Sequence, residues 1–307
     1  MIEEGGRKKE VLAYFGMVLN TSITGLSFIF MKVALKHTTP LDLLVHRFTA
    51  AMVVVVGLWA AGLIRLPRFD KARLKPLLLL ALFYPVLFFT LQTFGMKFST
   101  ASEAGIIFAV TPILTLLSAM IFLKERTSWL QKLGILLSVG GVILIILKTN
   151  SHLGASDPRG VVLLLLSVLS VVTYYTVGKK AGQRFSALEL TVLMTFLAFV
   201  TFNLWAAFVH YQTGTLNQFF VPLKQPGFLI PVLYLGILSS LLTSFLSNFA
   251  LTAIPASKIA VFNNLSPIIS VLGGIFILHE TLYAYHIVGG LLVLTGVAAT
   301  VLFKYRN

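Results

Sequence analysis

The chain has 307 residues, of which 57% are hydrophobic and 11% are charged, and its mean hydropathy is +0.93. A soluble domain carries about 25% charged residues, so this composition excludes an ordinary soluble enzyme. Cysteine is absent, which excludes a disulfide framework and a thiolate metal site.

Taken in chain order, the sequence contains ten apolar runs of the length that a helix needs to cross a bilayer, about 20 residues. We expect each run to be a helix, because lipid offers the backbone no hydrogen-bond partners. The runs cover residues 11–33, 43–64, 74–96, 101–123, 130–148, 160–178, 187–210, 228–251, 257–278 and 283–303.

The basic residues, which give a net charge of +14, lie between these runs. This pattern indicates anionic lipid headgroups rather than nucleic acid as the partner. An excess of Lys and Arg marks the cytoplasmic side, and 17 of the 24 basic residues fall on the side that holds both termini. We therefore expect a multi-pass protein of the cell (plasma or inner) membrane with N- and C-termini in the cytoplasm. The seven basic residues on the other side are Lys32, Lys36, Arg47, Lys97, Lys148, Arg159 and Lys224.

The two halves of the chain match each other. A shift of 155 residues aligns Pro112 with Pro267 and Glu125 with Glu280, and near the start of each half a shift of 147 aligns 41–43 with 188–190. We therefore divide the chain into 1–150 and 151–307, with five helices each. Five is odd, so the second copy enters the membrane from the opposite side. The predicted fold is an all-α integral membrane protein of ten transmembrane helices, arranged as two inverted five-helix repeats around a central cavity.

Two prolines, Pro112 and Pro267, lie near the middle of the fourth and ninth runs, where a proline removes a backbone hydrogen bond. Inverted-repeat transporters bind solutes at helices interrupted in matching positions. We interpret the prolines as kinks beside the cavity, and an ordinary packing kink is the alternative.

Three charged residues near helix ends are candidates for gating. Glu103 begins the fourth run, where capping of the helix N-terminus is the alternative role. Lys258 begins the ninth run, where its alternative is to reach the headgroups. Arg47 lies about one turn into the second run, and its alternative is to pair with Asp42 or with helix-end carbonyls.

Polar groups at mid-depth are costly in lipid and are therefore candidates for solute binding. Amides both donate and accept hydrogen bonds, which suits a zwitterion, and aromatic faces suit an apolar side chain or an ammonium group. The alternatives are bonds to the residue's own backbone and plain packing. The candidates are Asn20, Thr24, Tyr84, Phe88, Gln92, Phe108, Thr111, Tyr174, Tyr175, Thr243, Ser247, Asn263 and Asn264.

Several diffuse motifs are spread over both halves of the chain. They are Pro40-Leu41…Arg47, Ala101-Ser102-Glu103…Pro112, Pro255-Ala256-Ser257…Pro267, FLKER (122–126), QKLGILLSVGGVILI (131–145), ILHET (277–281) and HIVGGLLVLTGV (286–297). Through these motifs the chain resembles the EamA branch of the drug/metabolite transporter superfamily and is similar to its YddG-type amino-acid exporters. The resemblance implies a ten-helix bundle whose cavity is formed by helices 1, 3, 4, 6, 8 and 9, and export of small metabolites, commonly amino acids.

We therefore expect a secondary transporter that exports small metabolites, amino acids or related polar or amphiphilic compounds, by alternating access. Its expected partners are a small-molecule solute and membrane lipids, with no nucleic acid, no cofactor and no metal, and it is expected to be a monomer or weak dimer. One alternative is an exporter of organic cations, drugs or lipid-linked cargo, although residues 18–32 lack the acid of the small multidrug relatives. Others are an intramembrane enzyme and a structural or receptor-like bundle. The segment HETLY (279–283) lacks the second histidine of a zinc-protease helix, so no enzyme is expected.

Overall fold

The computed structural model describes residues 2–65, 71–122, 128–149, 157–181, 185–251, 253, 262 and 265–302. All regular structure in these residues is helical, which confirms the predicted all-α class. The first half forms α1 (Ile2–Ala34), α2 (Pro40–Ala60), α3 (Lys71–Ala81), the π-helix η1 (Leu82–Leu87), α4 (Phe88–Phe98), α5 (Ala101–Phe108), α6 (Thr111–Phe122) and α7 (Trp129–Thr149). The second half forms α8 (Pro158–Ala181), α9 (Ala187–Thr213), α10 (Leu216–Phe219), the 3₁₀-helix η3 (Val221–Lys224), α11 (Pro226–Leu233), the π-helix η4 (Tyr234–Leu242), α12 (Thr243–Leu251), α14 (Leu265–Leu278) and α15 (Ala284–Leu302).

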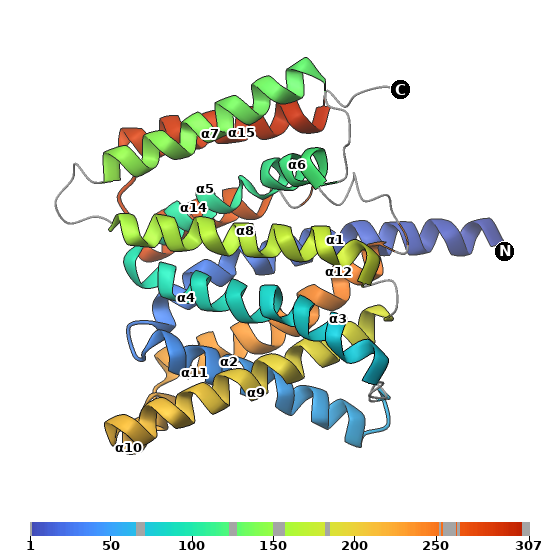
Figure 1. Ribbon diagram of the computed structural model, residues 1–307, viewed down its shortest axis with the longest axis vertical. Coiled ribbons are helices and arrows are strands. Elements are labelled where there is room, and N and C mark those ends of the chain that lie inside the picture. Colours follow the sequence, from blue (N-terminus) through green and yellow to red (C-terminus); the bar gives the residue numbers. More distant parts are fainter. Residues whose placement is uncertain are drawn as a thin grey trace.

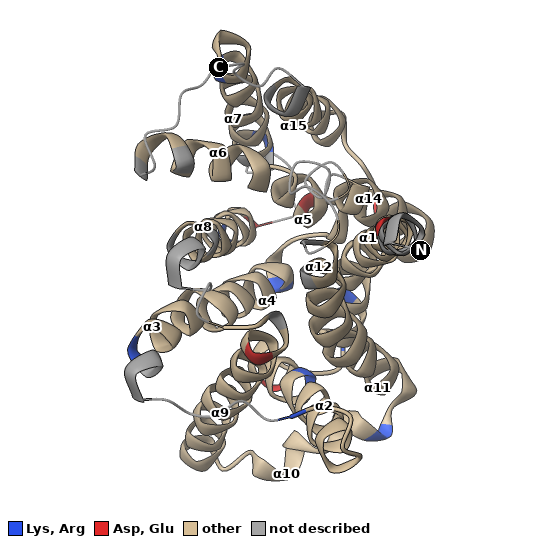
Figure 2. Cartoon of the chain, turned by 90° about the vertical axis from the view of Figure 1, so that its right-hand side faces the viewer, with Lys and Arg blue, Asp and Glu red and all other residues tan. Residues whose placement is uncertain are grey.

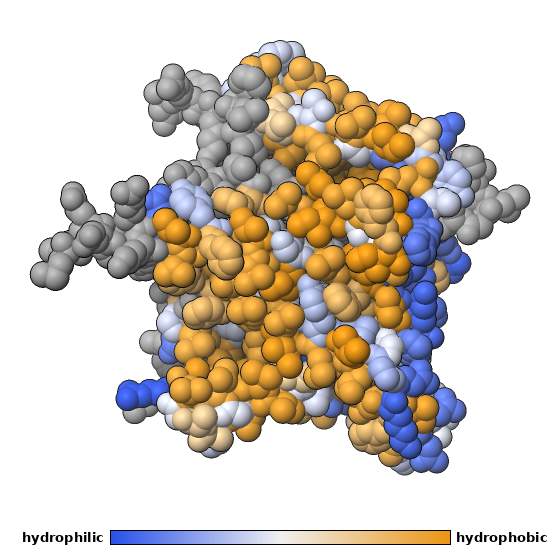
Figure 3. Space-filling model, turned by 180° about the vertical axis from the view of Figure 1, so that it is seen from behind, coloured by the Kyte–Doolittle hydropathy of each residue, from blue (hydrophilic) through white to orange (hydrophobic). Residues whose placement is uncertain are grey.

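Six helical stretches among the described residues are long and apolar enough to cross a membrane, and four shorter ones are also apolar. Each stretch overlaps one predicted run. The six are Glu10–Ala34, Pro40–Ala60, Lys75–Phe98, Ala101–Ser118, Leu188–Thr213 and Pro226–Ser247, and the four are Trp129–Ile145, Pro158–Tyr174, Leu265–Leu278 and Ala284–Ala299. Apolar side chains cover most of the face shown in Figure 3, and hydrophilic residues gather along one edge of it. The protein is therefore a multi-pass membrane protein.

The helices lie side by side in an elongated bundle (Figure 1). The pair α7 and α15 forms one end of it, and the pair α2 and α9 forms the other. Between them, α4 packs against α8, α5 against α14, and α1 against both α12 and α14. Figure 2, which views the helices end on, shows few charged segments within the bundle.

Glycines bring α7 and α15 into close contact. A methyl group placed on Gly141 would lie 2.6 Å from the carbonyl oxygen of Gly289, and one placed on Gly296 would collide with the backbone of Gly134. The sequence in which these glycines meet shows that the two helices run antiparallel, because the later glycine of α7 contacts the earlier glycine of α15. Small residues allow such close packing of membrane helices, where dispersion contacts replace the hydrophobic effect.

The fourth run is interrupted just before Pro112. The segment α5 ends at Phe108 and α6 begins at Thr111, so Pro112 lies in the first turn of α6 rather than in a helix interior. Proline is tolerated there, because a first-turn N–H has no partner within the helix. The carbonyl of Phe108, which residue 112 would bind in a continuous helix, accepts a hydrogen bond from the Thr111 hydroxyl at 2.6 Å. In α14, Pro267 likewise lies in the first turn.

The third and eighth runs contain π-helices at equivalent places, which the sequence did not predict. In η1, Tyr84 leaves the helical conformation with φ −142° and ψ 116°. The shift of 155 residues places η1 within η4. Because π-helical turns cluster at functional sites, we expect the functional site to lie near both segments.

Candidate functional site

Three predicted residues meet where α1 packs against α12. The side-chain amide of Asn20, which is 5% exposed, donates to the carbonyl of Thr243 at 2.7 Å and to the hydroxyl of Ser247 at 2.9 Å. Its side-chain oxygen has no hydrogen-bond partner among the described residues. The structure thus brings together a polar set from the two halves of the chain, with one acceptor still available.

Four predicted aromatic residues form a second set. The Tyr84 ring lies 5.1 Å from the Tyr174 ring and 5.2 Å from the Phe88 ring, measured between centroids. Phe88 in turn lies 6.0 Å from Phe108. The rings belong to η1, α4, α5 and α8, so this set also joins the two halves. Spacings of this size are typical of favourable aromatic pairs.

Ser244 connects the two sets. The Tyr84 hydroxyl lies close to the Ser244 side chain, and Ser244 follows Thr243 directly in α12. Aromatic and polar candidates therefore surround one region between η1, α4 and the η4–α12 segment. The Ser244 hydroxyl also donates to the backbone carbonyl of Ser240 at 2.7 Å, and the sequence alone does not distinguish such a serine from one that faces a solute.

Arg47 reaches the same region. The Arg47 side chain is buried and donates from Nε to Ser240 at 3.1 Å and from a terminal nitrogen to Ser239 at 3.3 Å. The alternative role of pairing with Asp42 is not observed, because Asp42 contacts His210 of α9 at 2.8 Å. Arg47 lies a turn and a half further along α2 than Asp42 and meets η4 instead.

Three other candidates are described but lie outside these contacts. Gln92 is buried, and its side-chain oxygen has no hydrogen-bond partner in the described part of the chain. Thr111 bonds the backbone of Phe108, which agrees with its alternative role. Thr24 is half-buried and contributes its carbonyl to a bond from Ser27.

The predicted residues Lys258, Asn263 and Asn264, and the side chain of Tyr175, lie outside the described residues.

Glu103 joins a network at the end of the bundle where α5 begins. Its carboxylate accepts from the Thr100 backbone N–H at 3.2 Å, and its own N–H donates to the Thr100 hydroxyl at 3.1 Å. The other carboxylate oxygen lies 3.0 Å from Nε2 of His286 in α15. Glu103 therefore caps α5, as its alternative role predicted, and also contacts the second half of the chain.

Two further residues lie near this network, and the sequence did not predict their contacts. Glu280 accepts from the backbone N–H groups of Ala101 and Ser102 at 2.7 and 2.9 Å, so it caps α5 from the loop after α14. Lys32 donates to the carbonyls of Met96 and Ser99 near the end of α4. A basic residue in the last turn of α1 was visible in the sequence, but its partners come from distant segments.

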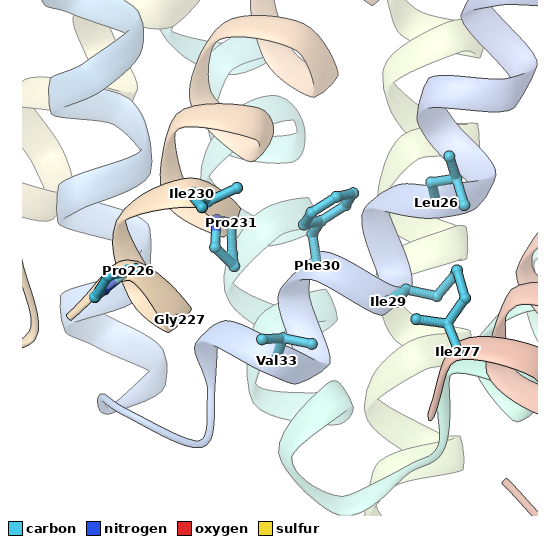
Figure 4. A pocket seen from close by; sticks show the side chains of 9 residues that line it. All are labelled: Leu26, Ile29, Phe30, Val33, Pro226, Gly227, Ile230, Pro231 and Ile277. Atoms are coloured by element: carbon cyan, nitrogen blue, oxygen red, sulfur yellow. The ribbon is translucent and has the colours of Figure 1, made fainter. Parts of the chain in front are cut away.

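An apolar pocket of about 330 Å³ lies elsewhere, between α1, α11 and α14 (Figure 4). Phe30, Ile230 and Ile277 contribute to its lining, and none of the predicted solute-binding residues does. A polar solute would find no hydrogen-bonding side chain among the residues that line it. The convergence at Tyr84 and Ser244 is therefore the better candidate site.

Comparisons with known proteins place the chain in a family. The EamA-like transporter family matches the chain twice, over residues 11–147 and 158–302. The uncharacterized transporter YcxC of Bacillus subtilis is 42% identical over 298 residues, which cover 96% of this chain and 94% of the relative. An uncharacterized transporter of Archaeoglobus fulgidus is 25% identical over 280 residues, covering 89% and 92%. One solved crystal structure has the same fold, with a TM-score of 0.59, 16% identity and coverage of 98% and 99%. With both halves matched, the chain belongs to the EamA-like transporter family and is a membrane transporter, not an enzyme.

Proposed function

We propose that this protein is a secondary transporter that exports small metabolites, amino acids or related polar or amphiphilic compounds, by alternating access. In this proposal ten spans form two inverted repeats, 1–150 and 151–307, around a central cavity. The export direction follows the resemblance to amino-acid exporters. The substrate class is argued below from the chemistry of the candidate site.

The inverted arrangement is supported by the way equivalent helices pair. Runs that occupy the same place in each half lie against each other: α7 against α15, α5 against α14, and α2 against α9. In α2 and α9, Asp42 contacts His210 and Thr49 contacts Asn203, so this pair is antiparallel, like α7 and α15. The shift of 155 residues exchanges the contact of Gly134 and Gly296 with that of Gly289 and Gly141. Repeats related by an inverted two-fold axis place equivalent helices antiparallel and exchange their contacts in this way. Parallel repeats would place equivalent helices parallel to each other.

The convergence of aromatic and polar groups from both halves at Tyr84 and Ser244 is the observation that carries the proposal. An amino acid has a charged polar end and a side chain that is often apolar, and the aromatic set lies next to the set of amide and hydroxyl groups. Because both halves contribute, rocking of one repeat against the other would open the region to each side in turn.

The same region disfavours an organic cation as cargo. Transporters that hold a cation within the membrane use buried carboxylates. The carboxylates that the structure describes are engaged outside this region: Glu10 with Tyr14, Asp42 with His210, Glu103 with Thr100 and His286, Asp157 with Arg159, Glu189 with Ser186, and Glu280 with Ala101 and Ser102. The buried cation of Arg47 would also repel a positively charged solute.

Counterflow in reconstituted vesicles tests the proposal. Vesicles containing purified protein are loaded with one unlabelled L-amino acid at a time, and entry of the labelled form is measured against protein-free vesicles. We expect saturable accumulation of at least one amino acid. A parallel panel uses labelled tetraphenylphosphonium as an organic cation. Movement of the cation with no movement of any amino acid would replace the proposed cargo with the alternative one.

A further inference from the structure

The guanidinium of Arg47 is a buried charge on α2, a helix long and apolar enough to cross a membrane. The residue is 2% exposed and lies seven residues after the start of α2, about 10 Å along the helix. Two of its N–H groups donate to the hydroxyls of Ser240 and Ser239, and the Phe89 ring centroid lies 4.3 Å from the guanidinium carbon. Hydroxyls and an aromatic face solvate the charge but do not neutralise it.

No described carboxylate neutralises Arg47. Each one has the partner given above, and Asp42, the acid on the same helix, is bound to His210. A buried charge without an opposite charge is strongly unfavourable. A guanidinium has five N–H donors, and the two hydroxyl bonds leave three of them without a partner among the described residues.

The contact of α2 with η4, where Arg47 lies, has an equivalent in the other half of the chain that contains no charge. The shift of 147 residues that aligns 41–43 with 188–190 places Met194 at the position of Arg47. Met194 of α9 is buried in an apolar cluster with Leu80 and Ala81, next to η1. The corresponding contact of Arg47 is with η4. The second half thus fills this helix crossing with the thioether of Met194, whereas the first half places the cation of Arg47 there, beside the candidate site.

We propose that Arg47 binds the carboxylate of the transported solute. The proposal rests on the proposed function and narrows its substrate class to compounds with a free carboxylate, amino acids among them. Ser239 and Ser240 hold the guanidinium plane, so its unpaired N–H groups can form charge-assisted bonds to both carboxylate oxygens. Tyr84 lies within electrostatic reach of Arg47, and its ring faces the aromatic set that would receive the solute side chain.

Matched acid and amide probes test this inference without depending on transport. Purified protein is titrated with each L-amino acid and with its C-terminal amide, such as L-leucine and L-leucinamide or L-phenylalanine and L-phenylalaninamide. Binding is read from the shift in thermal unfolding. We expect at least one acid to bind about 10- to 100-fold more tightly than its amide, the range for losing a hydrogen bond to a charged group. Equal binding of acid and amide across the panel, or binding of neither, would overturn the role of Arg47.

Two variants assign the preference to the residue. Arg47→Met installs the residue found in the other half and should bind acid and amide equally weakly. Arg47→Lys keeps the charge without the planar fork and should retain part of the preference. Arg159→Met, an exposed residue paired with Asp157, is the matched control and should behave as the native protein. An acid preference that survives in folded Arg47→Met contradicts the inference. If that variant does not fold, the inference is tested by comparing acid and amide binding in the native protein and in Arg47→Lys.

The counterflow experiment keeps the two proposals separate. Acid-selective binding that depends on Arg47, without movement of any amino acid, would support the carboxylate site and reject the proposed function. Transport of amino acids and their amides at equal rates would support the function and reject the carboxylate site.

Discussion

The carboxylate of Glu280 caps a helix that begins 179 residues before it in the chain. It accepts hydrogen bonds from Ala101 N–H at 2.7 Å, from Ser102 N–H at 2.9 Å and from the Ser102 hydroxyl at 2.7 Å. These N–H groups belong to the first turn of α5 and have no partner within the helix. A negative charge there also interacts favourably with the helix dipole. In the sequence, Glu280 stands out only as the repeat partner of Glu125 and as part of the ILHET motif.

We predict that Glu280→Gln lowers the free energy of unfolding by about 1–2 kcal/mol, because the amide keeps one acceptor oxygen but loses the charge. Thermal unfolding in detergent measures the effect. The matched control is Glu189→Gln, which changes the exposed cap of α9 and should cost less. An equal loss in both variants would contradict a special role for Glu280.

Asn20 is the residue whose amide joins α1 to α12 while its oxygen stays unpaired within the described structure. We predict that Asn20→Leu reduces transport about tenfold, since it removes both hydrogen bonds and the available acceptor. Counterflow of the amino acid identified by the vesicle panel measures this. The neighbouring Thr21→Val is the control: the Thr21 hydroxyl is buried and bonds only the carbonyls of Met17 and Val18 on its own helix. Equal transport by both variants would remove Asn20 from the site.

At the scale of the elements, the crossing of α7 and α15 provides a test with adjacent residues. Gly141 faces the backbone of Gly289 at a distance that admits no side chain, whereas Gly140 has open space around its Cα. We predict that Gly141→Val separates the helices and lowers the free energy of unfolding by about 1–3 kcal/mol, the usual cost of overpacking. Gly140→Val should change it by much less. Thermal unfolding of the pair measures the difference, and similar losses would show that helix propensity, not the crossing, determines the result.

At the scale of the whole molecule, the inverted repeats predict that equivalent positions of the two halves lie on opposite sides of the membrane. Arg65 and Gln212 correspond through the shift of 147 residues, and both are exposed. The chain has no cysteine, so a single Arg65→Cys or Gln212→Cys substitution provides a unique label. We predict that an impermeant maleimide applied to intact cells labels the Gln212→Cys variant, and that it labels the Arg65→Cys variant only after the membrane is opened. Labelling of both variants from one side would support parallel repeats.

The membrane class, the helical content and the places of the apolar runs were predictable from the sequence, as was the convergence of several candidates. Asn20, Thr243 and Ser247 meet as a mid-depth polar set, and Tyr84, Phe88, Phe108 and Tyr174 meet as an aromatic one. What could not be predicted was the choice between competing partners. Asp42 contacts His210, which is 168 residues away, rather than Arg47 five residues along its own helix, because the tilt and rotation of α2 decide which side chains meet.

The sequence by itself determined that this protein is a bundle of membrane helices with two matching halves. Run length, apolarity and the repeat register are properties of the chain alone, and lipid forces such runs to satisfy their own backbone hydrogen bonds. Only the tertiary structure decided where the fourth run breaks and which residues cap α5. It also decided that the Arg47 charge lies buried beside serines instead of an acid. These outcomes depend on how helices from the two halves approach one another, and no local pattern in the sequence contains that geometry.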